Sequence, residues 1–104
     1  MPAVTQDFDG YKIFYYSSQP YEANIYCYKA GNYVGRMVFF KDASSIPPNT
    51  NAGGTPSVHY PLTRFNDVIG ILRYEKPLYL FLNLDNLMGH VATASVEPTG
   101  EEEP

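Results

Sequence analysis

The stretch that decides the fold is ANIYCYKAGNYVGRMVFFKD, residues 23–42. Aromatic and β-branched residues dominate both of its halves, which is typical of β-strands, and Gly31-Asn32 separates the two. A glycine at the first central position is what a type II′ turn requires, because that residue must adopt a positive φ. The sequence therefore predicts a β-hairpin with strands over 23–30 and 33–42.

The predicted turn also fixes which residues oppose each other in the hairpin. Cys27 would face Arg36 on one side, and Tyr26 would face Met37 on the other. Neither side then has the regular polarity of a solvent-facing strand surface. Both faces of the predicted sheet therefore need a cover.

Further elements follow on both sides of the hairpin. A segment rich in aromatic and β-branched residues precedes it, and a long loop rich in Gly, Pro, Ser and Asn follows it. After the loop, apolar residues recur first at the spacing of a helix and then at the spacing of strands. The predicted strands are 11–17, 57–60, 78–84 and 88–96, the loop is 43–57, and the helix is 62–74.

The predicted helix carries its apolar residues on one face. Phe65, Val68, Ile69 and Leu72 have the spacing of such a stripe, and Thr63 is the expected N-cap. Gly70 interrupts the helix at a cost of about 1 kcal/mol relative to alanine, so we expect it to permit close approach of a strand or a partner.

The predicted fold class is α+β, with the element order ββββαββ. We expect an antiparallel sheet of about five to six strands with one amphipathic helix on one face, all within residues 10–96. Residues 1–9 are expected to be an N-terminal extension, and residues 97–104 an acidic flexible tail.

Length and charge limit the function further. The 104 residues have room for one domain, and Cys27 is the only cysteine, so no intramolecular disulfide can form. The net charge is −4, but residues 10–96 alone sum to +2, because the acidic residues concentrate at both ends. The first residues lack the pattern of a signal peptide, and no apolar run is long enough for a membrane span, so we expect a cytoplasmic protein.

No catalytic or cofactor-binding motif is present. The chain has no phosphate-binding loop, dinucleotide fingerprint or nucleophile elbow, and its cysteine and two histidines have no zinc-site spacing. We expect Cys27 to be a core residue and His59 and His90 to be packing or edge residues, with His90 opposite Phe81. The sequence therefore predicts a non-enzymatic binding module without metal or cofactor.

The first functional hypothesis is a homodimeric interaction module. One helix can cover only one face of the predicted sheet, and the opposite face is rich in Tyr and Phe. Leaving such a patch in water is unfavourable by about 25 cal/mol per Å². A second copy related by a two-fold axis is the commonest cover for such a surface.

The alternative hypothesis is a single-stranded nucleic-acid-binding domain. The segments Ile25-Tyr26-Cys27-Tyr28-Lys29 and Gly35-Arg36-Met37-Val38, followed by a helix that begins near Phe65, resemble the repeat of the PUR and Whirly domains over about residues 11–75. The resemblance implies a ββββα unit that binds single strands, and a dimer, because the family's repeats work in pairs. On this resemblance, Arg36 would contact phosphate and Tyr26, Tyr28 and Phe39 would stack on bases. Lys41 completes the candidate surface for a partner or a nucleic acid.

Overall fold

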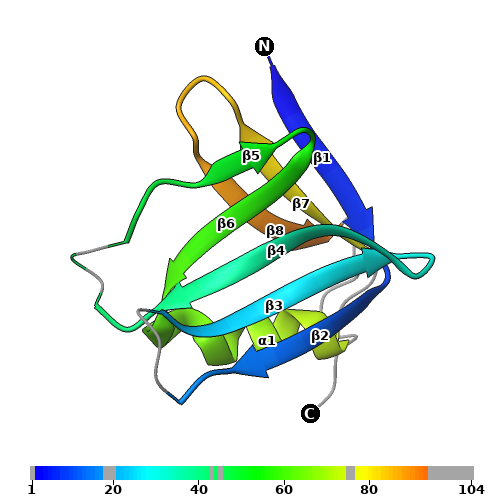
Figure 1. The fold of residues 1–104 in the computed structure, drawn as a ribbon. Helices are drawn as coiled ribbons and strands as arrows, with labels where there is room; N and C mark the ends of the chain where they lie inside the picture. Colours follow the sequence, from blue (N-terminus) through cyan, green and yellow to red (C-terminus); the bar gives the residue numbers. More distant parts are fainter. Residues whose placement is uncertain (1, 18–20, 43, 45, 75–76, 94–104) are drawn as a thin grey trace.

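The computed structural model describes residues 2–17, 21–42, 44, 46–74 and 77–93, with backbone only at 21 and 22. These residues form two β-sheets and an α-helix, so the α+β class is confirmed (Figure 1). The strands are β1 Ala3–Phe8, β2 Gly10–Tyr15, β3 Tyr21–Lys29, β4 Asn32–Phe40, β5 Thr50–Ala52, β6 Thr55–Pro61, β7 Leu78–Asn83 and β8 Gly89–Thr93. A 3-10 helix, η2 (Leu62–Arg64), leads into α1 (Phe65–Tyr74).

The single antiparallel sheet predicted from the sequence is wrong. One sheet has the strand order β2-β3-β4-β6-β5, and a second has the order β1-β7-β8. Within the larger sheet β6 runs parallel to β4. Part of the expected loop, residues 50–57, forms a β5–β6 hairpin around Gly53-Gly54. The hairpin reverses the chain after β5, so β6 lies beside β4 and runs in the same direction.

The hairpin of β3 and β4 exists, but its turn and register differ from the prediction. Lys29 pairs with Asn32, and Ala30 and Gly31 both have positive φ, as in a type I′ turn. Val34 is an extra residue between two paired positions, so it forms a β-bulge. The shift moves the opposing residues by one position, which changes the face on which each side chain of β4 lies.

The expected N-terminal extension contains a strand. β1 pairs with β7 along its whole length, from Ala3 opposite Asn83 to Phe8 opposite Leu78. The chain then bends at Asp9, whose N–H donates to the Tyr28 carbonyl at 2.9 Å, and continues as β2 in the other sheet. One bent segment therefore links the two sheets.

The core lies between the five-stranded sheet on one side and α1 together with β1, β7 and β8 on the other (Figure 1). The inner face of the larger sheet thus has two covers. The leucines of β7 are buried because they face this core, while the alternate residues of β7 are only half-buried. The fully buried hydrophobic residues of this core include Ala23, Ile25, Cys27, Met37, Phe39, Val58, Leu80 and Leu82.

Gly70 was predicted to permit a close approach and Thr63 to cap the helix, but the structure places both features elsewhere. A Cβ at Gly35 would lie 2.7 Å from Leu80 Cδ1 and 3.1 Å from the Pro56 carbonyl oxygen, so the close approach of the sheets occurs there. A Cβ at Gly70 would meet nothing within 4 Å, so the close approach expected at Gly70 is wrong within the subunit. The cap of η2 is Pro61, without a side-chain hydrogen bond, so Thr63 is not the N-cap.

The final elements are partly outside the described residues. β7 is confirmed, and His90 pairs with Phe81 as predicted, with ring centroids 4.9 Å apart. Residues 94–96 of the predicted last strand and the acidic tail at 97–104 lie outside the described residues. Among the described residues, no helix combines the length and apolarity needed to cross a membrane.

Candidate binding surface

The outer face of the five-stranded sheet, opposite α1, is the main candidate surface. Figure 1 shows no helix or strand of the described residues in front of it. Three cross-strand rows form this face, because paired residues point to the same side. The rows are Tyr28–Tyr33; Lys12–Tyr26–Arg36–Ser57–Thr50; and Phe14–Asn24–Val38–His59.

Aromatic rings on this face pack against each other. The ring of Tyr26 meets Phe14 at a centroid distance of 5.2 Å and Tyr33 at 5.6 Å, both edge to face. Phe14 is 42% exposed and Tyr33 is 46% exposed, so parts of both rings reach solvent. Lys12 Nζ lies 5.6 Å from the Tyr28 ring centroid, which places a cation at the edge of this aromatic cluster.

Asn24 lies beneath the aromatic cluster. Its amide nitrogen donates to the hydroxyl of Tyr26 at 3.2 Å and to that of Tyr16 at 3.4 Å. Asn24 is 1% exposed, and its amide oxygen has no hydrogen-bond partner among the described residues. A buried acceptor without a partner costs about 1–3 kcal/mol. The Asn24 amide therefore positions two tyrosines, and its unpaired oxygen lowers the stability of the fold.

Arg36 is held by a chain of hydrogen bonds. The carbonyl oxygen of Pro47 can only accept, so His59 Nδ1 donates to it at 3.0 Å and carries the proton of the neutral ring. His59 Nε2 then accepts from the Ser57 hydroxyl at 2.9 Å, and Ser57 Oγ accepts from Arg36 Nε at 2.9 Å. Burial lowers the pKa of His59, and the nearby Arg36 lowers it further against the opposing effect of the Pro47 carbonyl.

The pair Ser57–His59 also has the distance of a nucleophile and its base. Arg36 donates to the same serine oxygen, however, and Ser57 is only 5% exposed. The Ser57 oxygen therefore already accepts a hydrogen bond from Arg36 and does not point freely toward a substrate. The chain of hydrogen bonds therefore serves to orient the guanidinium group.

An open hollow lies beside Arg36. It measures about 260 Å³ and is lined by Tyr33, Arg36, Thr50, Ala52, Thr55 and Ser57. We call it the Arg36 hollow. Burial raises the pKa of the Tyr33 hydroxyl, and Arg36 partly offsets this, so the hydroxyl stays neutral at physiological pH. The hollow thus combines a cation, hydroxyl groups and an aromatic ring.

The structure brings together three of the five candidate residues. Tyr26 and Arg36 are direct neighbours across β3 and β4, and Tyr28 lies on the same face. Phe39 is wrongly placed in that set, because it is 0% exposed and packs in the core against Phe65 and Tyr60. Lys41 lies just beyond β4 and is exposed.

Sequence reasoning missed the other members of the surface. Tyr33, Ser57, His59 and Lys12 join it only because of the observed strand order and register. A bulge at Val34 turns Tyr33 toward Tyr26 and Tyr28, and the sequence contains no local signal for it. Ser57 and His59 alternate at period two on a short strand, which was the one available hint that they share a face.

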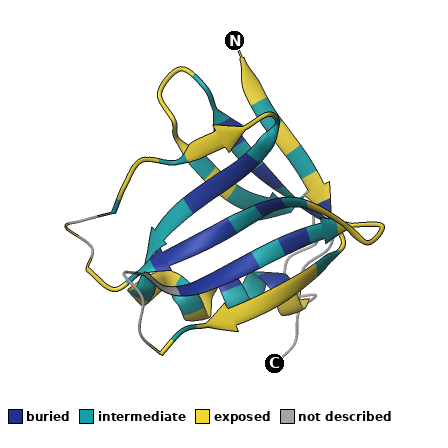
Figure 2. Ribbon diagram, viewed as in Figure 1, coloured by how far each residue is buried: buried dark blue, intermediate teal, exposed yellow. Residues whose placement is uncertain are grey.

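A second surface is the edge strand β2. Five of its six residues are exposed, and Figure 2 shows it almost entirely in the exposed colour. Tyr11, Ile13 and Tyr15 point to the inner side, where α1 does not fully cover them, and Tyr15 is 62% exposed. Lys12 is the only charged residue of the strand.

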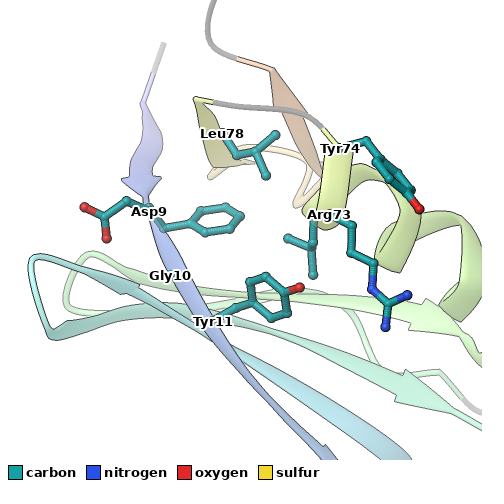
Figure 3. A pocket seen from close by; sticks show the side chains of 8 residues that line it. Asp9, Gly10, Tyr11, Arg73, Tyr74 and Leu78 are labelled. Carbon is teal, nitrogen blue, oxygen red and sulfur yellow. The ribbon is translucent and has the colours of Figure 1, made fainter. Parts of the chain in front are cut away.

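A small hollow of about 210 Å³ lies at the start of β2. Tyr11, Leu78, Arg73 and Tyr74 surround it, as Figure 3 shows, and Phe8, Asp9, Gly10 and Leu72 complete its lining. It lies between the start of β2 and the end of α1 (Figure 3). We call it the Tyr11 hollow.

The remaining candidates for chemistry lie in structural positions. Cys27 is fully buried, as expected, and burial raises the pKa of its thiol to about 12, so the thiolate needed for nucleophilic attack does not form at neutral pH. Among the described residues, no three His, Cys, Asp or Glu side chains lie close enough to hold a metal ion.

Comparison of the chain with protein-family models, curated proteins and solved structures found no match.

Proposed function

We propose that the protein is a non-enzymatic binding module that acts as a homodimer, with two copies joined through β2 and the ligand held on the outer face. The observation that carries the proposal is the exposed apolar edge of β2. An edge strand presents unpaired N–H and C=O groups, so an apolar edge of this length is a template for pairing with another strand.

Two-fold symmetry requires that the pairing of β2 with β2 of the partner subunit is centred on one residue, which lies opposite its own copy. A register centred on Ile13 places Ile13 opposite its own copy and Tyr11 opposite Tyr15 of the partner subunit. A register centred on Lys12 would oppose two like charges, which is unfavourable. The Ile13-centred register is therefore favoured.

Within the subunit the ring of Tyr15 lies edge to face against Phe65, with centroids 5.4 Å apart, and is still 62% exposed, so this register would cover it further. The partner's Tyr15 would lie beside Tyr11, which lines the Tyr11 hollow. The most exposed ring of β2 would thus enter a hollow lined by Phe8, Leu72 and Leu78. The contact would form twice, once on each side of the two-fold axis.

Covalent trapping tests the dimer and its register together. Ile13→Cys places two thiols opposite each other across the axis, within the range for a disulfide, and we expect a covalent dimer under mild oxidation. Lys12→Cys is the matched control, because its side chain would oppose Phe14 of the partner subunit. Equal cross-linking of the two variants, or a monomer by light scattering at micromolar concentration, would contradict the proposal.

A second candidate concerns the ligand, and the outer face favours single-stranded nucleic acid. Partly exposed rings at Phe14, Tyr26 and Tyr33 lie next to the cations Lys12 and Arg36, and stacking platforms flanked by cations are typical of proteins that bind single strands. The resemblance to PUR and Whirly domains supports the same ligand. A β2-paired dimer would join the two outer faces into one surface.

Fluorescence anisotropy with labelled oligonucleotides tests this candidate. We expect binding that weakens as salt rises, since each phosphate contact releases counterions. Tyr26→Ala should weaken binding about tenfold if one base stacks there. Tyr79→Ala, a change of the same kind on the three-stranded sheet, is the control. Unchanged anisotropy for the unmodified protein would exclude the candidate.

A further inference from the structure

We infer that the Arg36 hollow is a site for one nucleotide, with the phosphate on Arg36 and the base against the ring of Tyr33. The inference deepens the proposed nucleic-acid function and rests on it for the wider outer face. It adds a defined hollow and a base-binding ring, Tyr33, to an arginine for which the resemblance to PUR and Whirly domains implies only a phosphate contact.

The anion-binding half of the site is Arg36 with its neighbouring hydroxyls. Only Nε of the guanidinium is engaged among the described residues, by the Ser57 hydroxyl at 2.9 Å. The two terminal nitrogens therefore keep their donors for a ligand, and a guanidinium group matches the two oxygens of a phosphate. Thr50 and Thr55 supply hydroxyl groups on the same wall.

The orientation of Arg36 is set before any ligand arrives. The hydrogen bonds from Pro47 through His59 and Ser57 hold the guanidinium group by its Nε. Fixing a long side chain in advance lowers the entropy that binding must remove. A lone surface arginine would lack this arrangement.

The base-binding half is the ring of Tyr33, which lines the hollow and is 46% exposed. Its edge-to-face contacts with Tyr26 at 5.6 Å and Tyr28 at 6.1 Å fix its plane. A fixed, partly exposed ring next to a phosphate-binding cation is the pair of groups that a nucleotide requires, because stacking accepts any base. Inorganic phosphate would use only one half of the site.

Two sources could supply this chemistry, a free mononucleotide or one residue within a strand. The experiment titrates thymidine 5′-monophosphate, inorganic phosphate and a short oligothymidylate into the ¹⁵N-labelled full chain. We expect the amide signals of Tyr33, Arg36 and Ser57 to shift with the monophosphate, and more weakly with phosphate. Tighter binding of the oligothymidylate at the same residues assigns the site to a strand, and equal binding assigns it to a free nucleotide.

Variants locate the site. Arg36→Gln should weaken monophosphate binding at least about tenfold, and Arg36→Lys should restore it only in part, since the fork geometry is lost. Arg64→Gln on η2 removes the same charge away from the hollow and should leave binding unchanged. Dispersion of the ¹⁵N spectrum verifies that each variant is folded.

Three results would overturn the inference: phosphate binding as tightly as the monophosphate, Arg36→Gln behaving like Arg64→Gln, or shifts confined to other residues. If the oligothymidylate still binds the outer face while Arg36→Gln has no effect, the nucleotide site fails and the proposed nucleic-acid function stands. If no oligonucleotide binds but the monophosphate does, the site stands and the wider function fails.

Discussion

The inner and outer faces of the five-stranded sheet come from the same strands, yet their chemistry differs. The inner face is closed by α1 and the second sheet, and its residues, such as Ile25, Met37 and Phe39, are fully buried. The outer face has aromatic residues too, but its rings contact each other and alternate with Asn24, Arg36 and Ser57. Aromatic content alone therefore does not distinguish a core from a binding surface, whereas polar residues in register with the rings do.

The largest expected difference between the faces is in the cost of removing a ring. Phe39→Ala should lower the free energy of unfolding by about 3–5 kcal/mol, because the core cannot fill the cavity. Tyr28→Ala on the outer face should cost about 1 kcal/mol or less, because that ring is only half-buried. Urea unfolding measures both. Similar costs at the two positions would show that the outer face is as closed as the inner one.

Gly35 tests how tightly the second sheet packs on the inner face. Gly35→Ala should destabilise by about 1–3 kcal/mol, because the new Cβ would lie 2.7 Å from Leu80 Cδ1 and close to a backbone carbonyl. Gly70→Ala is the matched control in α1, where a Cβ has open space, and it should stabilise by about 0.5–1 kcal/mol. A neutral Gly35→Ala would mean that the two sheets can separate without loss.

Asn24 tests whether the outer face sacrifices stability for its arrangement. Asn24→Val removes an amide oxygen without a partner and should leave stability unchanged or raise it by about 1 kcal/mol. The same change should weaken oligonucleotide binding, because Tyr26 loses its hydrogen bond. A large loss of stability on thermal unfolding would instead assign Asn24 to the structural framework.

The smallest expected effect is a pH dependence from His59. Burial holds the pKa of His59 below the ordinary value of 6.5, so the unfolded chain binds more protons than the folded one as the pH falls through that range. Stability should therefore be complete above about pH 6.5 and decline below it. His59→Asn should remove this part of the slope in urea titrations. An unchanged slope would assign the decline to the carboxylates.

The sequence predicted the elements better than their arrangement. The strands of the hairpin (23–42), the helix (65–74) and β7 were predicted correctly because the spacing of their apolar residues is visible in the local sequence. The turn type was missed because alanine at position 30 disfavours the positive φ it adopts. In the fold, the Ala30 N–H donates to Asp9 Oδ1 at 3.3 Å, a contact from outside the hairpin. β1 and the parallel β4–β6 pair depend on residues far apart in sequence, for which spacing contains no signal.

The candidate surface shows the same limit. Tyr26, Tyr28 and Arg36 were identified from residue type, but the predicted register placed Arg36 on the face opposite Tyr26. A shift of one position reverses the faces of a strand, so it brought Arg36 to the rings and took Phe39 into the core. Residue type identified the groups, and only register shows which of them act together.

Hydrogen exchange of the β2 amides tests the homodimer most directly. In a dimer paired through β2, the amides that face away from β3 donate to the partner strand, so they should exchange slowly at micromolar concentration and quickly after dilution. Ile13→Arg should make them exchange quickly at every concentration. Fast exchange of these amides in the undiluted, unmodified protein would contradict the account.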